Sequence, residues 1–506
     1  MLDNLGQVLP AGARQYGDKP ALIFKGRAFS YRELNELSAR LAGGLCALGV
    51  QQGDRVTLYT QNCWEYVVSY FAIARLGAVI NPLNVMLTPD EVRFVVSDCG
   101  AKAVLASHAK GAGLLEALAG TPVRELILFG DEAVAGTRSF NALIEESSPL
   151  AEDVMTSPES LSTIGYTSGT TGHPKGAMQS QRAVLLNAAM TATMHVRTAA
   201  DTVVSALPLP HVYGNVVMNS ALLYGGTIVV LERFSEQETL DSIQRYGATI
   251  LDGVPTMYMY LLNYPDLERY DLSSLTRCAV GGQTMPVSKM HEVEQRFGVP
   301  LLELWGMTEL AGLGTTHPFY GVNRLGSIGV PLPYTEARIA DLADASITLG
   351  PDESGELLIR GPLVMMGYYG NEEATRQTIE PDGWLHTGDV ARMDKDGYFY
   401  IVDRKKDMIN TAGFKVYPAE IERVVAAHPA VAMVAVGSVP DELKGELARA
   451  YVVLKGGARA TEDDILAFCK EHLAAYKVPR SVAFVADLPK TSTGKIMRRE
   501  LKKLDL

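Results

Sequence analysis

The chain has 506 residues, of which 47% are hydrophobic, and its 58 acidic and 46 basic side chains give a net charge of −12. This composition excludes a disordered tail, a collagen-like fibre and a disulfide miniprotein, and the length suggests about three structural units, or one large and one small. The acidic balance argues against nucleic acid as a partner.

The cysteines are too few and too scattered for a disulfide framework or a zinc site: Cys46, Cys63, Cys99, Cys278 and Cys469. We therefore expect reduced thiols and a cytoplasmic location. Residues 1–17 have no basic start followed by an apolar run, so no secretory signal is expected.

The first half of the chain alternates β-branched runs with helical patterns. Capping-box spacings precede two apolar-periodic segments and predict helices there, at Ser30 with Glu33 (helix to about Leu48) and at Thr88 with Glu91. Strands are expected after them, at 55–59 and around 103–105. Such alternation is typical of layered α/β structure with largely parallel sheets.

Residues 202–231 contain no charged side chain, so they need to be checked as a membrane span. Pro208, Pro210 and paired glycines interrupt them, which favours a buried strand, loop, helix and strand instead. The α/β pattern then continues through the segments 248–251, 255–262, 277–280 and 301–304. From about Gly329 strands with turn signals predict a β-rich subdomain.

The pattern changes near residue 403, where a charged run separates a strand at 398–402 from a fresh αβ pattern. We expect an α/β protein with a large N-terminal domain of layered sheets, which includes the β-rich subdomain, and a small mobile α+β C-terminal domain. The predicted division is 1–402 for the large domain, 403–406 for a hinge and 407–506 for the small domain.

The most informative segment is the string from Tyr166 to Gly176, YTSGTTGHPKG. It follows a strand-like segment at 161–165 and precedes a helical stretch expected from Gln179. Its glycines let the backbone approach an anion, its hydroxyls can donate to phosphate oxygens, and Lys175 adds a positive charge. The order of Pro174, Lys175 and Gly176 differs from a Walker loop, but the string still indicates a polyphosphate site.

This string resembles the phosphate-binding loop of the adenylate-forming superfamily, which includes acyl-CoA synthetases, firefly-type luciferases and nonribosomal-peptide adenylation domains. Further segments match that superfamily in order and spacing, so the resemblance spans essentially the whole chain: LWGMTE (304–309), GELLIRG (355–361), GWLHTGD (383–389), DRKKD (403–407) and LPKTSTGK (488–495).

The resemblance implies ATP, magnesium and CoA as ligands and assigns roles to individual residues. The nucleotide would be bound by Thr167, Ser168, Gly169, Thr170, Thr171, Gly172, Lys175, Gly282, Gln283, Trp305, Gly306, Met307, Thr308, Asp389, Arg404 and Lys495. Glu309, with Thr171, would hold the magnesium ion that accompanies ATP. The residues implied in catalysis are Lys495, Thr308, Glu309 and His211.

The resemblance also implies a moving C-terminal domain and a thiol tunnel. Lys406 would be the hinge, and the tunnel would be lined by His211, Gly413, Phe414 and Lys415. The acyl pocket would draw on Tyr213, Val217, Gly281, Leu310 and Ala311, together with Gly282, Gln283 and Met307. None of these is basic, and Val212 stands where amino-acid-activating relatives have an aspartate, so a monocarboxylic acid with an apolar body is expected.

The predicted function is therefore an ATP-dependent acyl-CoA synthetase for a medium- or long-chain fatty acid. The alternatives are an aryl-CoA ligase, an enzyme that loads a separate carrier protein, a luciferase-type oxygenase and a nucleotide-sensing pseudoenzyme. The pseudoenzyme would be expected to have lost Lys495, Glu309 or Asp389, and all three are present. The expected partners are the acid, ATP and CoA, and a homodimer is left open.

Overall fold

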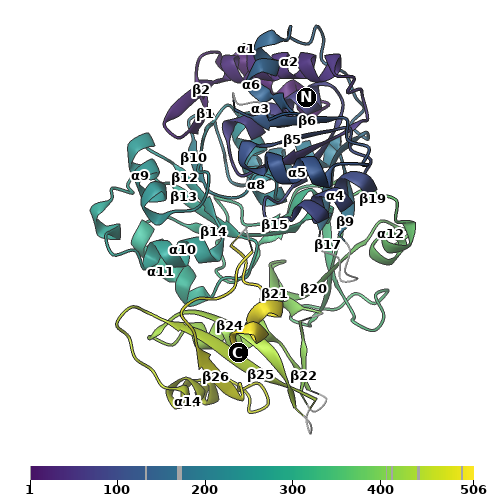
Figure 1. The fold of residues 1–506 in the computed structure, drawn as a ribbon. Coiled ribbons are helices and arrows are strands. Elements are labelled where there is room, and N and C mark those ends of the chain that lie inside the picture. Colours follow the sequence, from purple (N-terminus) through teal and green to yellow (C-terminus); the bar gives the residue numbers. More distant parts are fainter. Residues whose placement is uncertain are drawn as a thin grey trace.

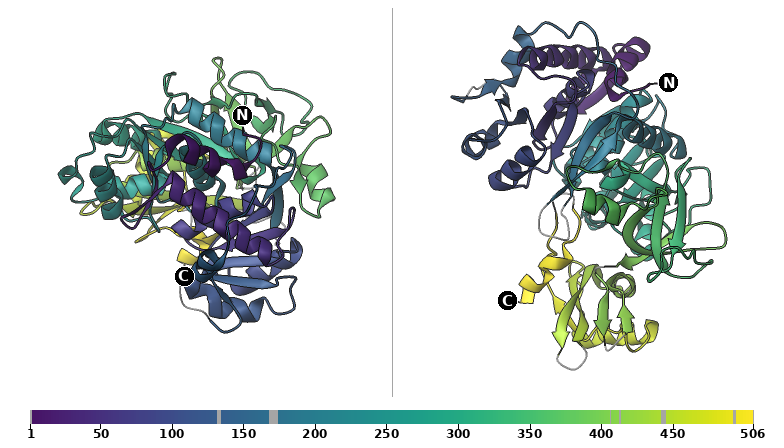
Figure 2. Two further views of the ribbon diagram at one scale, coloured as in Figure 1. Left: turned by 90° about the horizontal axis from the view of Figure 1, so that it is seen from above. Right: turned by 90° about the vertical axis from the view of Figure 1, so that its right-hand side faces the viewer.

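A computed structural model describes residues 2–130, 134–167, 174–405, 407–411, 414–441, 445–491 and 494–505. A large N-terminal domain carries a small C-terminal one at one end, and the C-terminal segment, yellow in Figure 1, runs back from the small domain toward the large one. Figure 2 shows the same arrangement from two further sides.

Two large sheets form the body of the N-terminal domain. In the first, the strand order is β16 (Val330–Pro331), β15 (Gly312–Thr316), β14 (Leu301–Met307), β13 (Arg277–Gly281), β12 (Ile250–Gly253), β10 (Thr202–Ser205), β11 (Thr227–Val230), β1 (Pro20–Phe24) and β2 (Arg27–Ser30). In the second, it is β19 (Gly367–Tyr368), β9 (Lys175–Ser180), β8 (Leu161–Thr167), β4 (Val79–Leu83), β3 (Arg55–Tyr59), β5 (Ala103–Ser107), β6 (Glu125–Phe129) and β7 (Arg138–Ser139). Central strands such as β12 and β13 pair in parallel, as the α/β alternation predicted.

Two smaller sheets follow in the sequence. The antiparallel sheet of the large domain contains β17 (Glu336–Ala340), β18 (Gly355–Arg360), β20 (Leu385–Met393) and β21 (Phe399–Arg404). The sheet of the small domain contains β23 (Phe414–Val416), β22 (Ile409–Thr411), β25 (Gly445–Leu454), β24 (Val431–Asp441) and β26 (Ser481–Phe484). The first of these is the expected β-rich subdomain, and the fold class is confirmed.

Helices cover the faces of these sheets. In the large domain they are α1 (Val8–Tyr16), α2 (Tyr31–Ala47), α3 (Trp64–Arg75), α4 (Pro89–Asp98), α5 (Gly111–Ala117), α6 (Phe140–Glu146), α7 (Gln181–Met194), α8 (Val212–Leu223), α9 (Glu236–Tyr246), α10 (Pro255–Leu262), α11 (Val287–Phe297) and α12 (Glu372–Thr378). In the small domain they are α13 (Pro418–Ala426) and α14 (Glu462–His472). Short 3-10 turns include η4 (Thr308–Leu310) and η5 (Arg498–Asp505).

The predicted capping residues begin the predicted helices. The Ser30 side chain accepts a hydrogen bond from the backbone N–H of Glu33 at the start of α2, and Thr88 forms a complete capping box with Glu91 at the start of α4. The uncharged segment 202–231 folds as β10, α8 and β11, as expected. In the part of the chain that the structure describes, no helix is both long and apolar enough to cross a membrane.

One prediction near the phosphate-binding string is wrong. A helix was expected from Gln179, but residues 175–180 form β9, and α7 begins at Gln181 after the N-cap Ser180. Strand β9 pairs with β8 on one side and β19 on the other. Hydrogen bonding to both neighbours therefore overrides the helical pattern that the local sequence suggested.

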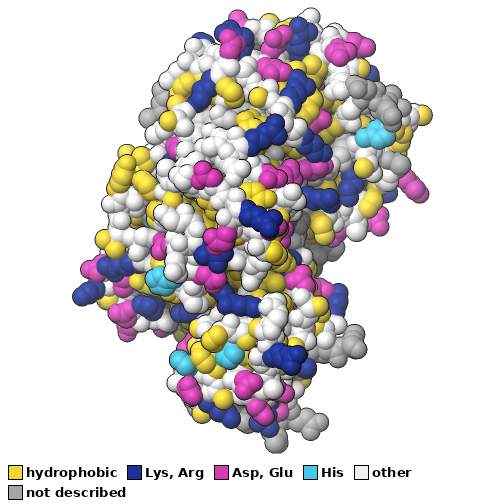
Figure 3. All heavy atoms as spheres, turned by 90° about the vertical axis from the view of Figure 1, so that its left-hand side faces the viewer, with side chains coloured by type: hydrophobic (Ala, Val, Ile, Leu, Met, Phe, Trp, Pro, Cys, Tyr) yellow, Lys and Arg dark blue, Asp and Glu magenta, His cyan; other side chains and the backbone are white. Residues whose placement is uncertain are grey.

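The two domains meet through a small apolar contact. Met259 of α10 packs in one cluster with Tyr451, Leu488 and Leu501 of the C-terminal domain, which also has a core of its own. On the face in Figure 3 acidic and basic side chains are interspersed over both domains. The residue limits 402 and 407 stay predictions.

Candidate active site

Lys495 lies on a short hairpin that reaches from the small domain to the large one. Within the lysine loop, which we define as residues 489–497, the backbone N–H of Thr491 donates to the carbonyl of Lys495 at 2.7 Å, and that of Met497 to the carbonyl of Pro489 at 2.8 Å. The Thr491 hydroxyl also accepts from the N–H of Lys495 at 3.0 Å. These bonds hold Lys495 at a defined position in the loop.

Side chains of the large domain bind the backbone of this loop. The Thr256 hydroxyl donates to the carbonyl of Gly494 at 2.8 Å, and the Gln283 amide donates to the carbonyl of Ile496 at 3.2 Å. Thr256 belongs to α10, and Gln283 follows β13. The lysine loop is therefore docked on the large domain in this structure.

The Lys495 side chain passes directly over Gly282. A Cβ atom added to Gly282 would lie 3.0 Å from Lys495 Cε, and Gly282 has φ of +92°, so both the space and the backbone conformation favour glycine here. Burial, together with the positive charge of Arg404, lowers the pKa of Lys495 to about 8, and Asp389 opposes this shift. These effects place the lysine within electrostatic reach of two other predicted nucleotide-binding residues.

Trp305, Asp389 and Arg404 form one hydrogen-bonded group beside the lysine. The Trp305 indole N–H donates to Asp389 Oδ2 at 2.7 Å, and Arg404 Nε lies 3.3 Å from Asp389 Oδ1. Asp389 and Arg404 are direct partners in the pairing of β20 with β21. Burial raises the pKa of Asp389, and Arg404, Trp305 and Lys495 oppose that rise. Sequence reasoning named all three members of this group.

Glu309 is 7% exposed and lies in η4, directly after β14. Its Oε1 atom accepts from the Tyr368 hydroxyl at 2.8 Å, and the Lys175 ammonium lies 5.2 Å from the Tyr368 ring centroid. Burial raises the pKa of Glu309, while Tyr368, Arg404 and Lys175 lower it. Tyr368 was not predicted, because a tyrosine in a Tyr-Tyr-Gly turn has no distinguishing spacing.

The ends of the phosphate-binding string lie next to Thr308. Thr167 pairs with Lys175 where β8 meets β9, and a Cβ added to Gly165 would lie 2.7 Å from Thr308 Cγ2. The Gln179 amide donates to the carbonyl of Thr308 at 2.9 Å. The rest of the predicted loop lies outside the described residues: Ser168, Gly169, Thr170, Thr171 and Gly172.

His211 is the N-cap residue of α8, and its Nδ1 atom accepts from the backbone N–H of Tyr213 at 3.2 Å. Burial lowers the pKa of His211 to about 3, and the positive charge of Lys495 adds to the effect. The imidazole is therefore neutral at physiological pH and lies within electrostatic reach of the lysine loop.

The predicted acyl-pocket residues divide into two groups. Gly282, Gln283 and Met307 are half-buried, and the first two contact the lysine loop. The other five are buried: Tyr213 is 5% exposed, and Val217, Gly281, Leu310 and Ala311 are buried as well. Tyr213 donates from its hydroxyl to Asp252 Oδ1 at 3.4 Å, and Asp252 was not among the predicted residues.

The predicted hinge and tunnel can be followed only in part. Lys406 and Gly413 lie outside the described residues, and Phe414 and Lys415 are described only as part of β23. Beside them, Arg498 Nη1 lies 2.9 Å from Asp403 Oδ1, and its Nη2 lies 2.7 Å from Glu422 Oε2. Sequence reasoning missed Arg498, since an arginine in a basic C-terminal run is usually solvent-exposed.

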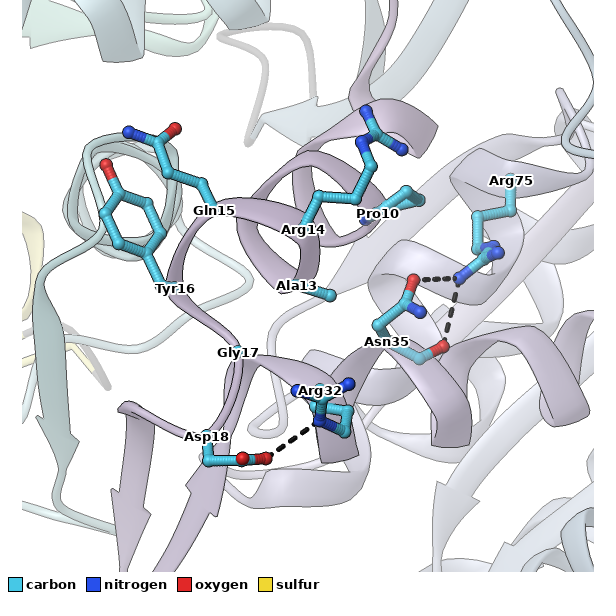
Figure 4. A pocket seen from close by; sticks show the side chains of 10 residues that line it. All are labelled: Pro10, Ala13, Arg14, Gln15, Tyr16, Gly17, Asp18, Arg32, Asn35 and Arg75. Atoms are coloured by element: carbon cyan, nitrogen blue, oxygen red, sulfur yellow. Dashed lines mark hydrogen bonds and ion pairs between the residues drawn. The ribbon is translucent and has the colours of Figure 1, made fainter.

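A surface hollow formed by α1 and α2 lies at the far end of the large domain from the lysine loop. Figure 4 shows Arg32 bonded to Asp18 and Arg75 bonded to Asn35. The side chains do not converge on a common point, so this hollow is separate from the candidate active site. In the described ranges no group of three or more His, Cys, Asp or Glu side chains could hold a metal ion.

Residues 9–369 match the family described as AMP-binding enzyme, and residues 420–495 match the AMP-binding enzyme C-terminal domain. The chain belongs to the AMP-binding enzyme family. It is 34% identical over 527 residues to a long-chain-fatty-acid–CoA ligase of Bacillus subtilis, covering 98% of this chain and 94% of that protein. It is 35% identical over 497 residues to a feruloyl-CoA synthase of an Amycolatopsis species, covering 97% of each.

The crystal structure of the anthranilate CoA ligase AuaEII with anthranoyl-AMP superimposes with a TM-score of 0.93 at 29% identity, covering 99% of this chain and 97% of that one. These matches confirm the resemblance to the adenylate-forming superfamily. They identify this AMP-binding enzyme as an AMP-forming acid–thiol ligase. The relatives act on both fatty and aromatic acids, so they do not define the acid.

Proposed function

We propose that this AMP-binding enzyme activates a monocarboxylic acid with ATP and transfers the acyl group to CoA. In the first half-reaction a carboxylate oxygen attacks the α-phosphorus of ATP, and pyrophosphate leaves. In the second, the CoA sulfur attacks the acyl-adenylate carbonyl, AMP leaves and the thiol proton is released. The observation that carries this proposal is the docked lysine loop, which brings Lys495 beside Gly282, Asp389 and Arg404.

The first half-reaction needs positioned positive charge more than acid–base chemistry. Lys495 would bridge the substrate carboxylate and the α-phosphate, and Thr308 would donate its hydroxyl to the α-phosphate. Lys175 and the loop residues Thr167, Ser168, Gly169, Thr170, Thr171 and Gly172 would hold the outer phosphates. Trp305 would stack against the adenine, next to Gly306. Asp389 and Arg404 would bind the ribose.

Glu309 fits the magnesium ion that accompanies ATP. Magnesium bound with ATP commonly takes one or two carboxylates and completes its shell with phosphate oxygens and water, so a single carboxylate is a sufficient donor. Glu309 is buried, oriented by Tyr368 and next to the end of the phosphate-binding string. Bound there with Thr171, the ion would neutralise charge on the leaving pyrophosphate.

The second half-reaction would use another orientation of the small domain. Rotation about Lys406 would withdraw Lys495 and bring Gly413, Phe414 and Lys415 to line a thiol tunnel with His211. We assign His211 to the wall of the tunnel, because its Nδ1 atom already accepts from the backbone N–H of Tyr213 at the start of α8. The contacts of Arg498 with Asp403 support this scheme, because they join the predicted hinge to the chain end that carries Lys495.

For the acid we keep the medium- or long-chain fatty acid as the first candidate, because the Bacillus relative acts on long-chain fatty acids. An aryl acid is the second candidate, because a feruloyl-CoA synthase and an anthranilate CoA ligase are also among the relatives. A screen of carboxylic acids for AMP formation, with and without CoA, tests the function and the acceptor together. AMP formation at full rate without CoA but with a carrier protein would contradict the CoA assignment, and no AMP with any acid would refute ligase activity.

A further inference from the structure

A buried ion pair lies behind the lysine loop, next to the predicted acyl pocket. Arg197 Nη2 lies 2.9 Å from each carboxylate oxygen of Asp252. Asp252 is completely buried and Arg197 is 4% exposed. The Tyr213 hydroxyl also donates to Asp252 Oδ1, so the pair faces a residue assigned to the acyl pocket. We call Tyr213, Asp252 and Arg197 the polar floor.

The guanidinium of this pair is only partly satisfied. Both bonds to Asp252 come from Nη2, and among the described residues no acceptor reaches Arg197 Nε or Nη1. Buried N–H groups are nearly always hydrogen-bonded, and an unpaired one is costly. The missing acceptor is therefore expected from a ligand or a buried water molecule.

The polar floor is close to the place where the substrate carboxylate would bind. Val254 Cγ1 would lie 3.4 Å from a Cβ on Gly282, and Val254 Cγ2 3.0 Å from a Cβ on Gly494, so Val254 touches the lysine loop. Asp252 precedes Val254 by two residues of extended chain, on the same side of the strand. Two extended residues span about 7 Å.

We propose that the polar floor ends the acyl pocket about 7 Å from the lysine loop, and that it selects a compact acid with a neutral oxygen at its far end. That length suits one substituted ring or a short chain, whereas a long alkyl chain would have to displace Tyr213 and the ion pair behind it. The oxygen is neutral because Asp252 already balances the charge of Arg197. This inference rests on the proposed ligase function, and within it favours an aryl or other compact acid over the long-chain fatty acid.

The first test uses the wild-type chain with ATP, magnesium and CoA, and it compares acids of equal shape. The pairs are 4-hydroxybenzoate with 4-methylbenzoate, and 5-oxohexanoate with 5-methylhexanoate; palmitate and adipate complete the set. In at least one pair the oxygenated acid should have a kcat/KM about 100-fold higher than its methyl analogue, because polar groups built to bind an oxygen reject a methyl group. The kcat/KM for palmitate should be lower than that for the preferred oxygenated acid.

The second test removes the polar floor without leaving a buried charge unpaired. The double variant Arg197→Met with Asp252→Leu should reduce that preference to near one or reverse it. The matched control is Arg277→Met with Asp201→Leu. It removes a second buried ion pair of the same sheet, in which Arg277 lies opposite Ile250, further from the lysine loop. The control should keep the wild-type preference.

Other outcomes distinguish an error about the polar floor from an error about the ligase function. If palmitate is the best substrate, if both pairs show equal rates, or if adipate exceeds every neutral acid, the inference is overturned while the ligase function stands. The same holds if the control changes the preference as much as the Arg197 and Asp252 double variant. If none of the acids yields AMP, the proposed function fails, and the inference fails with it.

Discussion

The burial of Lys495 lowers its pKa, and the pKa decides at which pH the side chain carries the charge that catalysis needs. A lysine in water keeps its proton far above neutral pH, but here burial and Arg404 bring its pKa to about 8. The ammonium that the first half-reaction needs is therefore lost within a range that ordinary assays reach. Two predictions follow from this single side chain.

Replacing Lys495 with alanine should slow adenylate formation by ~10²- to 10³-fold, because one positioned charge at the reacting phosphate is lost. Transfer of a supplied acyl-adenylate to CoA should be nearly unchanged. The two half-reactions are measured separately, as pyrophosphate release and as thioester formation. Lys490→Ala is the control, since Lys490 lies in the same loop but pairs with Asp487. Equal loss in both half-reactions would show that Lys495 has another role.

The pH profile gives an independent test of the same charge. Deprotonation of Lys495 should make kcat/KM for adenylate formation fall as the pH rises through about 8. Lys495→Arg should abolish this fall, because a guanidinium stays protonated. Between about pH 8 and the ordinary pKa of lysine, Lys495 is protonated in the unfolded chain but not in the folded one. The free energy of unfolding of the wild type should therefore rise with pH in this range, while the activity falls. A profile that is flat from pH 7 to 9 would contradict the assignment.

At the scale of elements, the lysine loop depends on bonds supplied by the large domain. Thr256, at the start of α10, is 2% exposed and donates to the carbonyl of Gly494. The loop has few other polar anchors among the described residues, of which Gln283 is one. Docking of the loop therefore depends on residues of α10 and of the segment after β13 as well as on the loop itself.

Thr256→Val keeps the shape of the side chain but removes this donor. A lost hydrogen bond of about 1 kcal/mol should lower the rate of adenylate formation roughly 5-fold, with no change in thioester formation. Thr276→Val is a suitable control, because Thr276 donates to a backbone carbonyl of the same domain but lies away from the loop. A matching loss in both half-reactions would mean that Thr256 supports the fold rather than the docking.

Local signals in the sequence predicted many elements but not the contacts between distant ones. Ser30, Thr88 and the strand at 55–59 could be recognised because caps and β-branched runs act over a few residues. Strand β9 was missed because its stability comes from pairing with β8 and β19. The bonds from Tyr368 to Glu309 and from Arg197 to Asp252 join residues 59 and 55 positions apart, so no spacing in one sequence could reveal them.

At the scale of the whole molecule, the two domains share one reaction. Trp305 and Asp389 of the nucleotide-binding group belong to the large domain, Arg404 lies at the end of β21 in the predicted hinge, and Lys495 comes from the small domain. Arg498 joins Asp403, at the start of the predicted hinge, to Glu422 in α13 of the small domain. The change from the first half-reaction to the second should therefore require free backbone rotation at Lys406.

Lys406→Pro tests that dependence, because proline fixes φ near −65° and removes a backbone donor. The variant should keep one half-reaction near normal and strongly impair the other, with little change in thermal stability. Lys406→Ala is the control, since it removes the charge but keeps the backbone free, and both half-reactions should then continue. Normal rates of both half-reactions in the proline variant would place the pivot elsewhere in 403–407.

The bond between Trp305 and Asp389 also provides an optical signal. The chain has three tryptophans. Trp64 stacks on Phe29, and Trp384 lies beneath Arg338, so each has ring partners outside the nucleotide group. If the ribose takes the carboxylate of Asp389, the Trp305 indole loses its anionic acceptor and gains an adenine against its ring. Intrinsic fluorescence would then register the arrival of the nucleotide in the unlabelled enzyme, before any chemical step.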